Sequence, residues 1–452
     1  APDRERRLLG ALLRQGIEVY RVDADFAPRG AVGALGQAAP ASMHRGTYLV
    51  PAAQPNGALA HALLDFDPRM TDAFLVQERQ ELTRKGETRL FDVTAWDLGR
   101  AFAVDAWWVD EPAVARTQVT SPPDRTVGAA GGNGPPPYAW IVDGRDDGSV
   151  AFAGRALELG VRVRVADEPF LDRGSLMPRG TVVVLRADNP GDIHAQVDAA
   201  ARAAGVPALA AQTGRAQGDG PDLGGHHFHL LERPRIAVLT GAPIDPGEVG
   251  HVWHELDQEL GVPFTMIDAQ YLGTYDLRRY SVLVVPGGGR GLGGLLQGQA
   301  KALQTWVADG GTLIALGEAA ELVTGTDMGL TQVKTRADAL TELELYAAAA
   351  KADLDARDIR VDPHTVWDGR RPSPAAKDKA KGDDDAGDDE LSKQQEQWAS
   401  RFAPHGVIAR GLVAEHEWIT FGTGAELPVP ADGGAYLMAR PPVHAPIRLA
   451  PP

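Results

Sequence analysis

The chain has 452 residues, enough for two or three domains with separate cores, and its composition is 44% hydrophobic and 23% charged, as in ordinary soluble globular proteins. The net charge of −16 disfavours nucleic acid and anionic membranes as partners, because both bind basic surfaces. The absence of cysteine excludes disulfides, thiolate nucleophiles and cysteine-ligated zinc. Because no apolar run reaches 18 residues, no membrane span is predicted.

Residues 1–115 predict a mixed α+β region. Leucines at helical spacing indicate a helix over residues 4–16, and the alternating segment IEVYRVDADF predicts a strand after it. Residues 46–55 predict a second strand, and residues 57–65 and 69–83 predict two further helices. Because the chain starts inside a helix and without methionine, we expect it to be a piece of a longer polypeptide.

The next segments differ in composition. Residues 116–136 are rich in glycine and proline and predict a linker, and residues 137–232 predict a small α/β unit. Residues 371–397 are acidic and carry almost no large apolar side chain, so we expect a disordered insertion. Residues 398–452 contain the segments VIARGLV, EWITFG and AYLMAR, which predict a β-rich completion of the preceding domain.

Residues 233–370 show the most regular pattern in the chain. RIAVLTG, SVLVVPGGG and TLIAL have the apolar character of buried strands, and two helical segments alternate with them. This order predicts an α/β fold with a doubly wound, mostly parallel sheet.

A glycine run, Pro286-Gly-Gly-Gly-Arg290-Gly291, lies between a predicted strand and a predicted helix. Such a run could cradle phosphate at a helix N-terminus. It has neither the lysine and serine or threonine of a P-loop nor the spacing of a dinucleotide fingerprint. A turn that requires glycine conformations is therefore the simpler interpretation.

The last predicted strand leads into the turn Leu316-Gly317-Glu318-Ala319. A nucleophile elbow would need cysteine or serine here, beside a general base. Glu318 could act as a base, but the sequence offers it no partner, so the turn predicts a degenerate site.

Histidines cluster at two places before the tail. His251 and His254 are three residues apart on a predicted helix, with Trp253 and Leu256 expected on its core face. His227 and His229 flank Phe228 on a predicted strand, next to His226, and both could reach one metal ion. Neither cluster has a full zinc motif, so a solvated helix face and a strand edge are the simpler interpretations.

A histidine–glutamate pair and a group of three tryptophans are the remaining candidate functional sites. His416 and Glu417, beside Trp418, lie where an amidotransferase carries its histidine and glutamate, but adjacent residues in a strand point to opposite faces. Trp96, Trp107 and Trp108 could form a platform for sugar or peptide, and domain packing explains them as well. No catalytic, cofactor-binding or metal-ligating residue is assigned.

Residues 1–115 contain the short blocks Val50-Pro51, Gln54-Pro55, Leu63-Leu64-Asp65 and Asp92-Val-Thr-Ala-Trp-Asp-Leu98. In this order they resemble the region that follows the catalytic domain in bacterial M14-type zinc carboxypeptidase-like proteins. The later blocks PRIAVLTG, WHELDQELGVPFTMID, YSVLVVPGGG, WVADGGTLIALGEAAELV and HEWITFGTGAELPV resemble the class I glutamine amidotransferase-like domain of the same proteins.

The resemblance implies a non-catalytic C-terminal portion whose zinc-binding peptidase domain lies outside these residues. The implied partner is that peptidase domain or chain, with a homo-oligomer as an alternative, and the implied location is secreted or periplasmic. Two other functions stay open: an independent hydrolase that uses Glu318 and nearby histidines, and a small-ligand module at the cleft of Gly287–Gly291 and Glu318.

Overall fold

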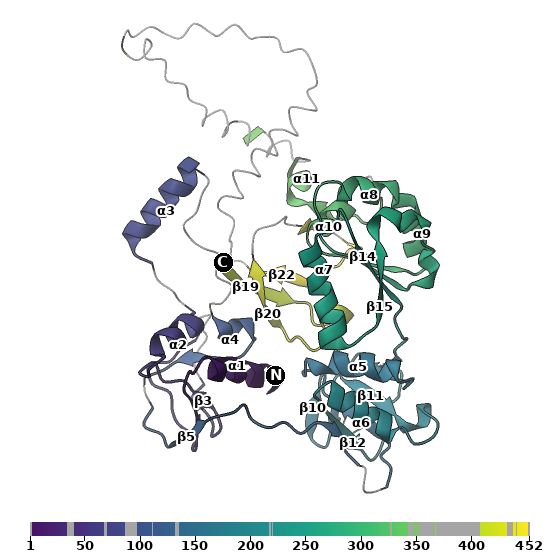
Figure 1. Cartoon of the computed structure of the whole chain (residues 1–452). Helices are drawn as coiled ribbons and strands as arrows, with labels where there is room; N and C mark the ends of the chain where they lie inside the picture. Colours follow the sequence, from purple (N-terminus) through teal and green to yellow (C-terminus); the bar gives the residue numbers. More distant parts are fainter. Residues whose placement is uncertain are drawn as a thin grey trace.

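The computed structural model describes residues 2–33, 40–66, 70–85, 97–110, 112–131, 135–216, 218, 220–325, 328–341, 348–349, 352, 367, 407–431, 437–439 and 441–450. Within these residues the chain is a mixed α and β protein with one six-stranded mixed sheet and one four-stranded parallel sheet. Smaller sheets of two or three strands make up the other described strands (Figure 1). The predicted acidic insertion at 371–397 lies outside the described residues.

The N-terminal unit packs short helices on a three-stranded sheet. Its amphipathic first helix buries Leu8, Leu9 and Leu12 against this sheet, as the leucine spacing predicts. The sheet has the order β3-β1-β5, and a separate pair joins β2 to β4. The elements are α1 (Pro2–Arg14), β1 (Val19–Val22), β2 (Val32–Gly33), β3 (Tyr48–Leu49), α2 (Gly57–Leu64), α3 (Asp72–Lys85), α4 (Leu98–Ala101), β4 (Trp107–Trp108) and β5 (Arg116–Val119).

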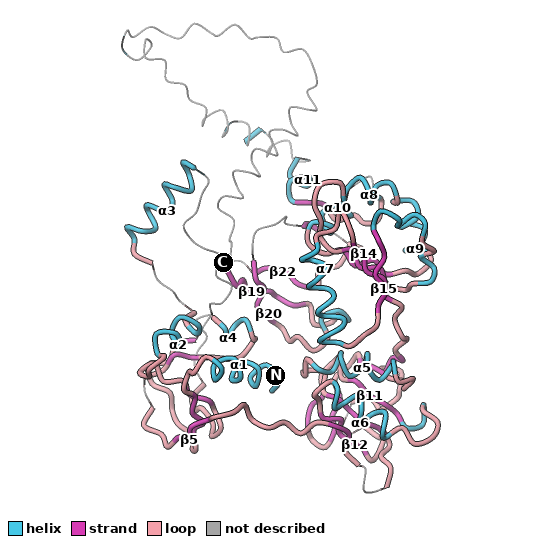
Figure 2. The backbone as a smooth tube through the Cα atoms, viewed as in Figure 1, coloured by secondary structure: helices cyan, strands magenta, loops and turns pink. Residues whose placement is uncertain are grey.

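The predicted linker connects two units, but both of its ends belong to sheets. β5 pairs with β1 in the N-terminal unit. β6 (Gly128–Ala129) pairs with β12 (Pro207–Ala211), a strand of the six-stranded sheet. Residues 120–127 cross between the units as a loop (Figure 2). Strand pairing is a long-range property, so glycine and proline content alone could not reveal it.

The second unit has the order β13-β8-β11-β7-β12-β6, and every pair except β12 with β6 is antiparallel. One face packs under two helices around Trp140, Phe152 and Val197. The other face packs against a hairpin around Phe170 and Met177. The remaining elements are β7 (Ala139–Val142), α5 (Gly148–Glu158), β8 (Arg164–Ala166), β9 (Phe170–Asp172), β10 (Ser175–Met177), β11 (Val182–Leu185), η1 (Arg186–Asp188), α6 (His194–Ala203) and β13 (Phe228–Leu230).

The third unit holds the parallel sheet, in the order β15-β14-β16-β17. Its two inner strands are apolar and buried, as expected for strands covered on both faces. The sequence prediction missed the edge strand β15. The elements are β14 (Ile236–Thr240), α7 (Pro246–Trp253), the π-helix η2 (His254–Leu260), β15 (Phe264–Asp268), η3 (Ala269–Thr274), η4 (Leu277–Arg279), β16 (Val282–Val285), α8 (Leu292–Gly298), α9 (Ala300–Ala308), β17 (Thr312–Ala315), α10 (Glu318–Thr324), β18 (Lys334–Thr335) and α11 (Arg336–Thr341).

Helices lie on both faces of this sheet (Figure 1). α7 and η2 cover the face that carries Val238 and Val284, whereas α8 and α9 cover the face that carries Leu239 and Leu283. Asp245 caps α7 by accepting hydrogen bonds from the backbone N–H groups of Gly247 and Glu248, at 2.7 and 3.1 Å. In this unit the apolar strand segments and the Asp245 cap therefore agree with the packing of helices on both faces of the sheet.

The C-terminal strands are β structure that does not join the parallel sheet. β19 (Val407–Val413) lies between β20 (Glu426–Ala431) and β22 (Ile447–Leu449) in a separate antiparallel sheet, and β21 (Leu437–Met438) pairs with β18. The segment EWITFG, predicted as a strand, contains the 3₁₀ helix η6 (Trp418–Thr420). Hydrogen bonds from the Thr420 hydroxyl to the carbonyl oxygens of Ala414 and Glu417 hold this turn closed.

Candidate functional site

The carboxyl edge of the parallel sheet brings three loops together, where ligands bind in open α/β sheets. The glycine run follows β16 and lies against the loop that follows β14. Asp245 N donates to Gly287 O at 3.0 Å, and Gly289 N donates to Pro243 O at 3.0 Å. A Cβ on Gly288 would lie 2.5 Å from Pro243 O. Gly288 therefore allows two backbones to approach, which supports the turn interpretation rather than a phosphate cradle.

The turn after β17 has a strained backbone at Gly317, the residue before Glu318. Gly317 has φ 53° and ψ −129°, outside the regions allowed to residues with a Cβ. A Cβ built there would meet no atom within 4 Å, so the glycine is required by the backbone and not by crowding. Glu318 is instead the first residue of α10. A side chain at position 317 would project into open space, as a nucleophile does at a strand-to-helix elbow.

Two glutamates flank this turn. Glu248 lies in the first turn of α7 and Glu318 is the first residue of α10, so each negative charge interacts favourably with the positive end of its helix dipole. A Cβ on Gly287 would lie 3.5 Å from Glu248 Cγ and 3.7 Å from Glu318 N, so the three positions are close. The Glu318 carboxylate is exposed and forms no hydrogen bond or ion pair to any histidine in the described part of the chain. Among the described residues, Glu318 therefore has no histidine as an acid–base partner.

The α7 histidines lie on the outside of the molecule. His251 and His254 are both exposed, and α7 gives way to the π-helix η2 between them. Val252 and Leu256 pack on the sheet, but Trp253 is 41% exposed. The prediction that Trp253 faces the core is wrong, because the buried stripe runs through residues 252, 256 and 260.

His227 and His229 share a carboxylate that sequence reasoning missed. His227 Nδ1 lies 2.8 Å from Asp167 Oδ1, and His229 Nε2 lies 2.6 Å from Asp167 Oδ2. Asp167 follows β8, whose antiparallel pairing with β13 places it opposite His227. Burial acts to raise the pKa of Asp167, but the hydrogen bonds from His229 and His227 outweigh it, so the pKa lies below its usual value.

The spacing His-x-x-Glu, which the resemblance implies for the zinc site of a peptidase domain, occurs once in this chain, from His229 to Glu232. His229 lies in β13, and Glu232 lies two residues beyond the end of that strand. Among the described residues, no group of three or more histidines, aspartates or glutamates is arranged to hold a metal ion.

The late histidine and glutamate do interact, because they lie in a turn and not in a strand. His416 Nε2 lies 3.3 Å from Glu417 Oε1, and His444 Nδ1 lies 2.6 Å from the same oxygen. Both histidines are largely exposed. Adjacent side chains in a turn can contact each other, whereas in the predicted strand they would point to opposite faces.

In the described part of the N-terminal unit, Gln54, Asp97 and Trp108 make packing or capping contacts. The Gln54 amide bonds to both backbone groups of Glu18, with Oε1 2.6 Å from Glu18 N and Nε2 3.2 Å from Glu18 O. Asp97 caps α4 by accepting from Arg100 N at 3.0 Å. Trp108 packs against His61, with ring centroids 5.2 Å apart, and Trp107 is half-buried beside it. Trp96 lies outside the described residues.

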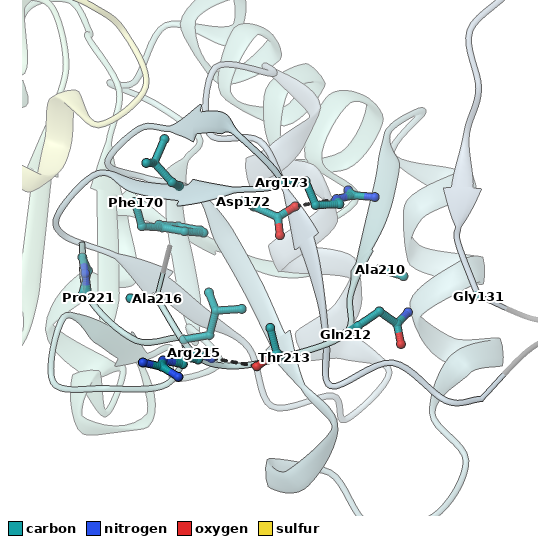
Figure 3. A pocket seen from close by; sticks show the side chains of 12 residues that line it. Gly131, Phe170, Asp172, Arg173, Ala210, Gln212, Thr213, Arg215, Ala216 and Pro221 are labelled. Carbon is teal, nitrogen blue, oxygen red and sulfur yellow. Dashed lines mark hydrogen bonds and ion pairs between the residues drawn. The ribbon is translucent and has the colours of Figure 1, made fainter. Parts of the chain in front are cut away.

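A cavity of about 370 Å³ opens in the antiparallel unit, between the β9–β10 hairpin and residues 212–216 and 221–223 (Figure 3). Its walls combine apolar side chains with Asp172, Arg173, Gln212 and Arg215. No sequence motif marked this cavity, because its walls come from segments about 40 residues apart that only the sheet brings together.

Comparison with family models, with curated protein sequences and with solved structures gave no match for this chain. In the described ranges, no helix combines the length and the apolar content that crossing a membrane requires.

Proposed function

We propose that this chain is the non-catalytic C-terminal portion of an M14-like zinc carboxypeptidase. In this proposal the parallel unit is a degenerate, doubly wound amidotransferase-like domain, and residues 1–115 join it to the peptidase domain. The role is structural: docking on the peptidase domain and shaping substrate access to it. The full-length protein would be secreted or periplasmic, with its zinc in the peptidase domain.

Gly317 is the observation that carries the non-catalytic part of the proposal. The turn keeps the strained backbone of an elbow, yet the position that would carry a nucleophile has no side chain. Glu318, the nearest carboxylate, points from the start of α10 and has no histidine partner among the described residues. An elbow without nucleophile and base cannot run acyl transfer of the amidotransferase type.

The contacts of α1 support a joining role for the N-terminal unit. Arg4 pairs with Asp147, the residue before α5, at 2.6 Å, and Arg7 pairs with Glu259 of η2 at 2.8 Å, so this helix of the N-terminal unit contacts both other units. Exposed ion pairs add little stability, but they fix orientation. The unit also presents exposed Leu75 and Val76 on α3, apolar surface of the kind that a further domain covers.

Native purification tests this proposal. We expect the purified protein to contain a polypeptide with a His-x-x-Glu zinc site, covalently continuous with this chain or bound to it, and about one zinc per complex. Intact mass, peptide mapping and zinc analysis on one sample measure this. A lone 48.0 kDa species without zinc would refute the assembly.

The closeness of Glu248, Gly287 and Glu318 favours a second candidate, a small-ligand module or hydrolase at the sheet edge. If Glu318 served as a general base, Glu318→Gln would abolish hydrolysis of activated esters. Glu255→Gln, which removes an exposed carboxylate from η2, would leave it unchanged. Equal rates in both variants and the parent would eliminate this candidate.

A further inference from the structure

The parallel sheet has a free lateral edge at β17, the last strand in the order β15-β14-β16-β17. Thr312 N donates to Ser281 O at 2.9 Å, so the backbone groups of the even-numbered β17 residues face β16. Because the N–H and C=O of one residue in a parallel strand point to the same side, those of Leu313 and Ala315 point away from the sheet. Within the described chain no strand pairs with that side, and neither residue forms a hydrogen bond there.

An apolar side chain lies uncovered beside this edge. The register of the sheet places Val238, Val284 and Ile314 in one row across the face that α7 and η2 cover. Val238 and Val284 are only 1% and 6% exposed, whereas Ile314 is 41% exposed. A strand added beside β17 would therefore gain apolar contact with Ile314 as well as backbone hydrogen bonds.

β17 lacks the charges and prolines with which proteins usually block the edges of their sheets. Residues 310–317 read GGTLIALG and carry no charge, in a chain whose net charge is −16. By contrast, the opposite edge strand β15 ends in Asp268, and the edge strand β20 of the C-terminal sheet carries Glu426 and Pro428. Two acidic copies of the chain can therefore approach at β17 with less repulsion than at these charged edges.

The outward backbone groups of β17 are self-complementary. In an antiparallel pair, opposed residues that exchange both hydrogen bonds alternate with opposed residues that exchange none. When a two-fold axis passes beside Ile314, Leu313 of one copy faces Ala315 of the second copy, and every outward group of these residues is paired. The two Ile314 residues then form the central pair, with Cα atoms about 4.5 Å apart and side chains on the same face of the joined sheet.

We propose that β17 pairs antiparallel with β17 of a second copy of this chain, about a two-fold axis beside Ile314. The contact consists of those hydrogen bonds and the central Ile314 pair. It is smaller than the interfaces of stable dimers, so we expect a Kd of about 10–100 μM. Exposed Asp309 and Glu318 flank the strand and repel each other across the axis, so salt tightens the association. This interface is independent of the function proposed above.

Sedimentation velocity of the full chain, over about 1–500 μM, tests the proposal. We expect the 48.0 kDa monomer to give way to a species of twice that mass. Hydrogen exchange gives a second readout on the unaltered protein. Exchange of the Leu313 and Ala315 amides should slow as the concentration rises, whereas the Ile314 amide, which faces β16, should be protected throughout.

Substitutions at the axis test the pairing itself. Ile314→Lys places like charges opposite each other and should weaken the dimer about 10-fold or more. Met266→Lys is the matched control, because Met266 lies in the same row of the sheet, is 50% exposed and belongs to the opposite edge strand. Ile314→Glu alone should also stay monomeric. An equimolar mixture of the lysine and glutamate variants should associate again, since opposite charges then meet at the axis.

Three results would overturn the proposal: a monomer at every concentration, equal weakening by Ile314→Lys and Met266→Lys, or a mixture of the Ile314→Lys and Ile314→Glu variants that stays monomeric. A dimer in which the Leu313 and Ala315 amides exchange as fast as in the monomer would place the contact elsewhere and would also refute the pairing of β17.

Discussion

Replacement of Gly317 by alanine isolates the backbone strain of the turn after β17. Neither Gly317 nor Gly294 of α8 has any atom within 4 Å of a built Cβ, so alanine creates no clash at either position. The two differ in backbone conformation, because Gly317 has φ 53° and ψ −129° whereas Gly294 is helical. Gly294→Ala is therefore a matched control in the same unit.

The expected effects have opposite signs. A residue with a Cβ in a sparsely populated backbone region costs about 1–3 kcal/mol, so Gly317→Ala should lower the free energy of unfolding of the parallel unit by that amount. Glycine inside a helix costs about 0.5–1 kcal/mol relative to alanine, so Gly294→Ala should raise it by that amount. Gly317→Asn should destabilise the unit as much as Gly317→Ala does, because a ψ of −129° lies outside the left-handed helical region that asparagine tolerates.

Native-state hydrogen exchange of the β16 and β17 amides measures this local stability. Gly317→Ala should speed their exchange about 5- to 150-fold, and Gly294→Ala should slow it about 2- to 5-fold. Unchanged exchange in Gly317→Ala, or an asparagine variant as protected as the parent, would refute the strained conformation. The degenerate elbow would then lose its structural basis.

Other parts of the molecule give further expectations. Phe152→Ala, at a fully buried side chain of α5, should cost about 3–5 kcal/mol, whereas Val150→Ala on the exposed face of the same helix should cost under about 0.5 kcal/mol, as measured by denaturant unfolding. Asp245→Ala removes the cap of α7 and should destabilise this helix by about 0.5–2 kcal/mol, measured as faster hydrogen exchange of its amides. Asp245→Ser keeps a capping oxygen and should retain most of the exchange protection. The pKa of Asp167 is lowered on folding, so its interactions stabilise the protein fully above the unfolded pKa and are lost as pH falls through the folded value. In His229→Gln the carbon-13 titration midpoint of the Asp167 carboxyl should rise; an unchanged midpoint would show that the hydrogen bond does not hold the charge.

The organisation of the parallel unit could be predicted because its signals are local. The apolar runs at residues 236–240 and 282–285, the Asp245 cap with Pro246 and the glycine after β17 each specify a strand, a helix start or a turn within a few residues. Strand β15 was missed because its pattern is short and its Met266 side chain is exposed at the sheet edge.

The sequence by itself determined which segments are buried strands and amphipathic helices, the absence of cysteine chemistry and the position of the sharp turn after β17. Only the tertiary structure decided that Asp167 meets His227 and His229, that Arg215 and Phe170 line one cavity, and that the last strands form their own sheet. The physical reason is range. Helix periodicity, caps and glycine turns act over a few residues, whereas strand order and side-chain convergence depend on pairings between segments 40 to 60 residues apart.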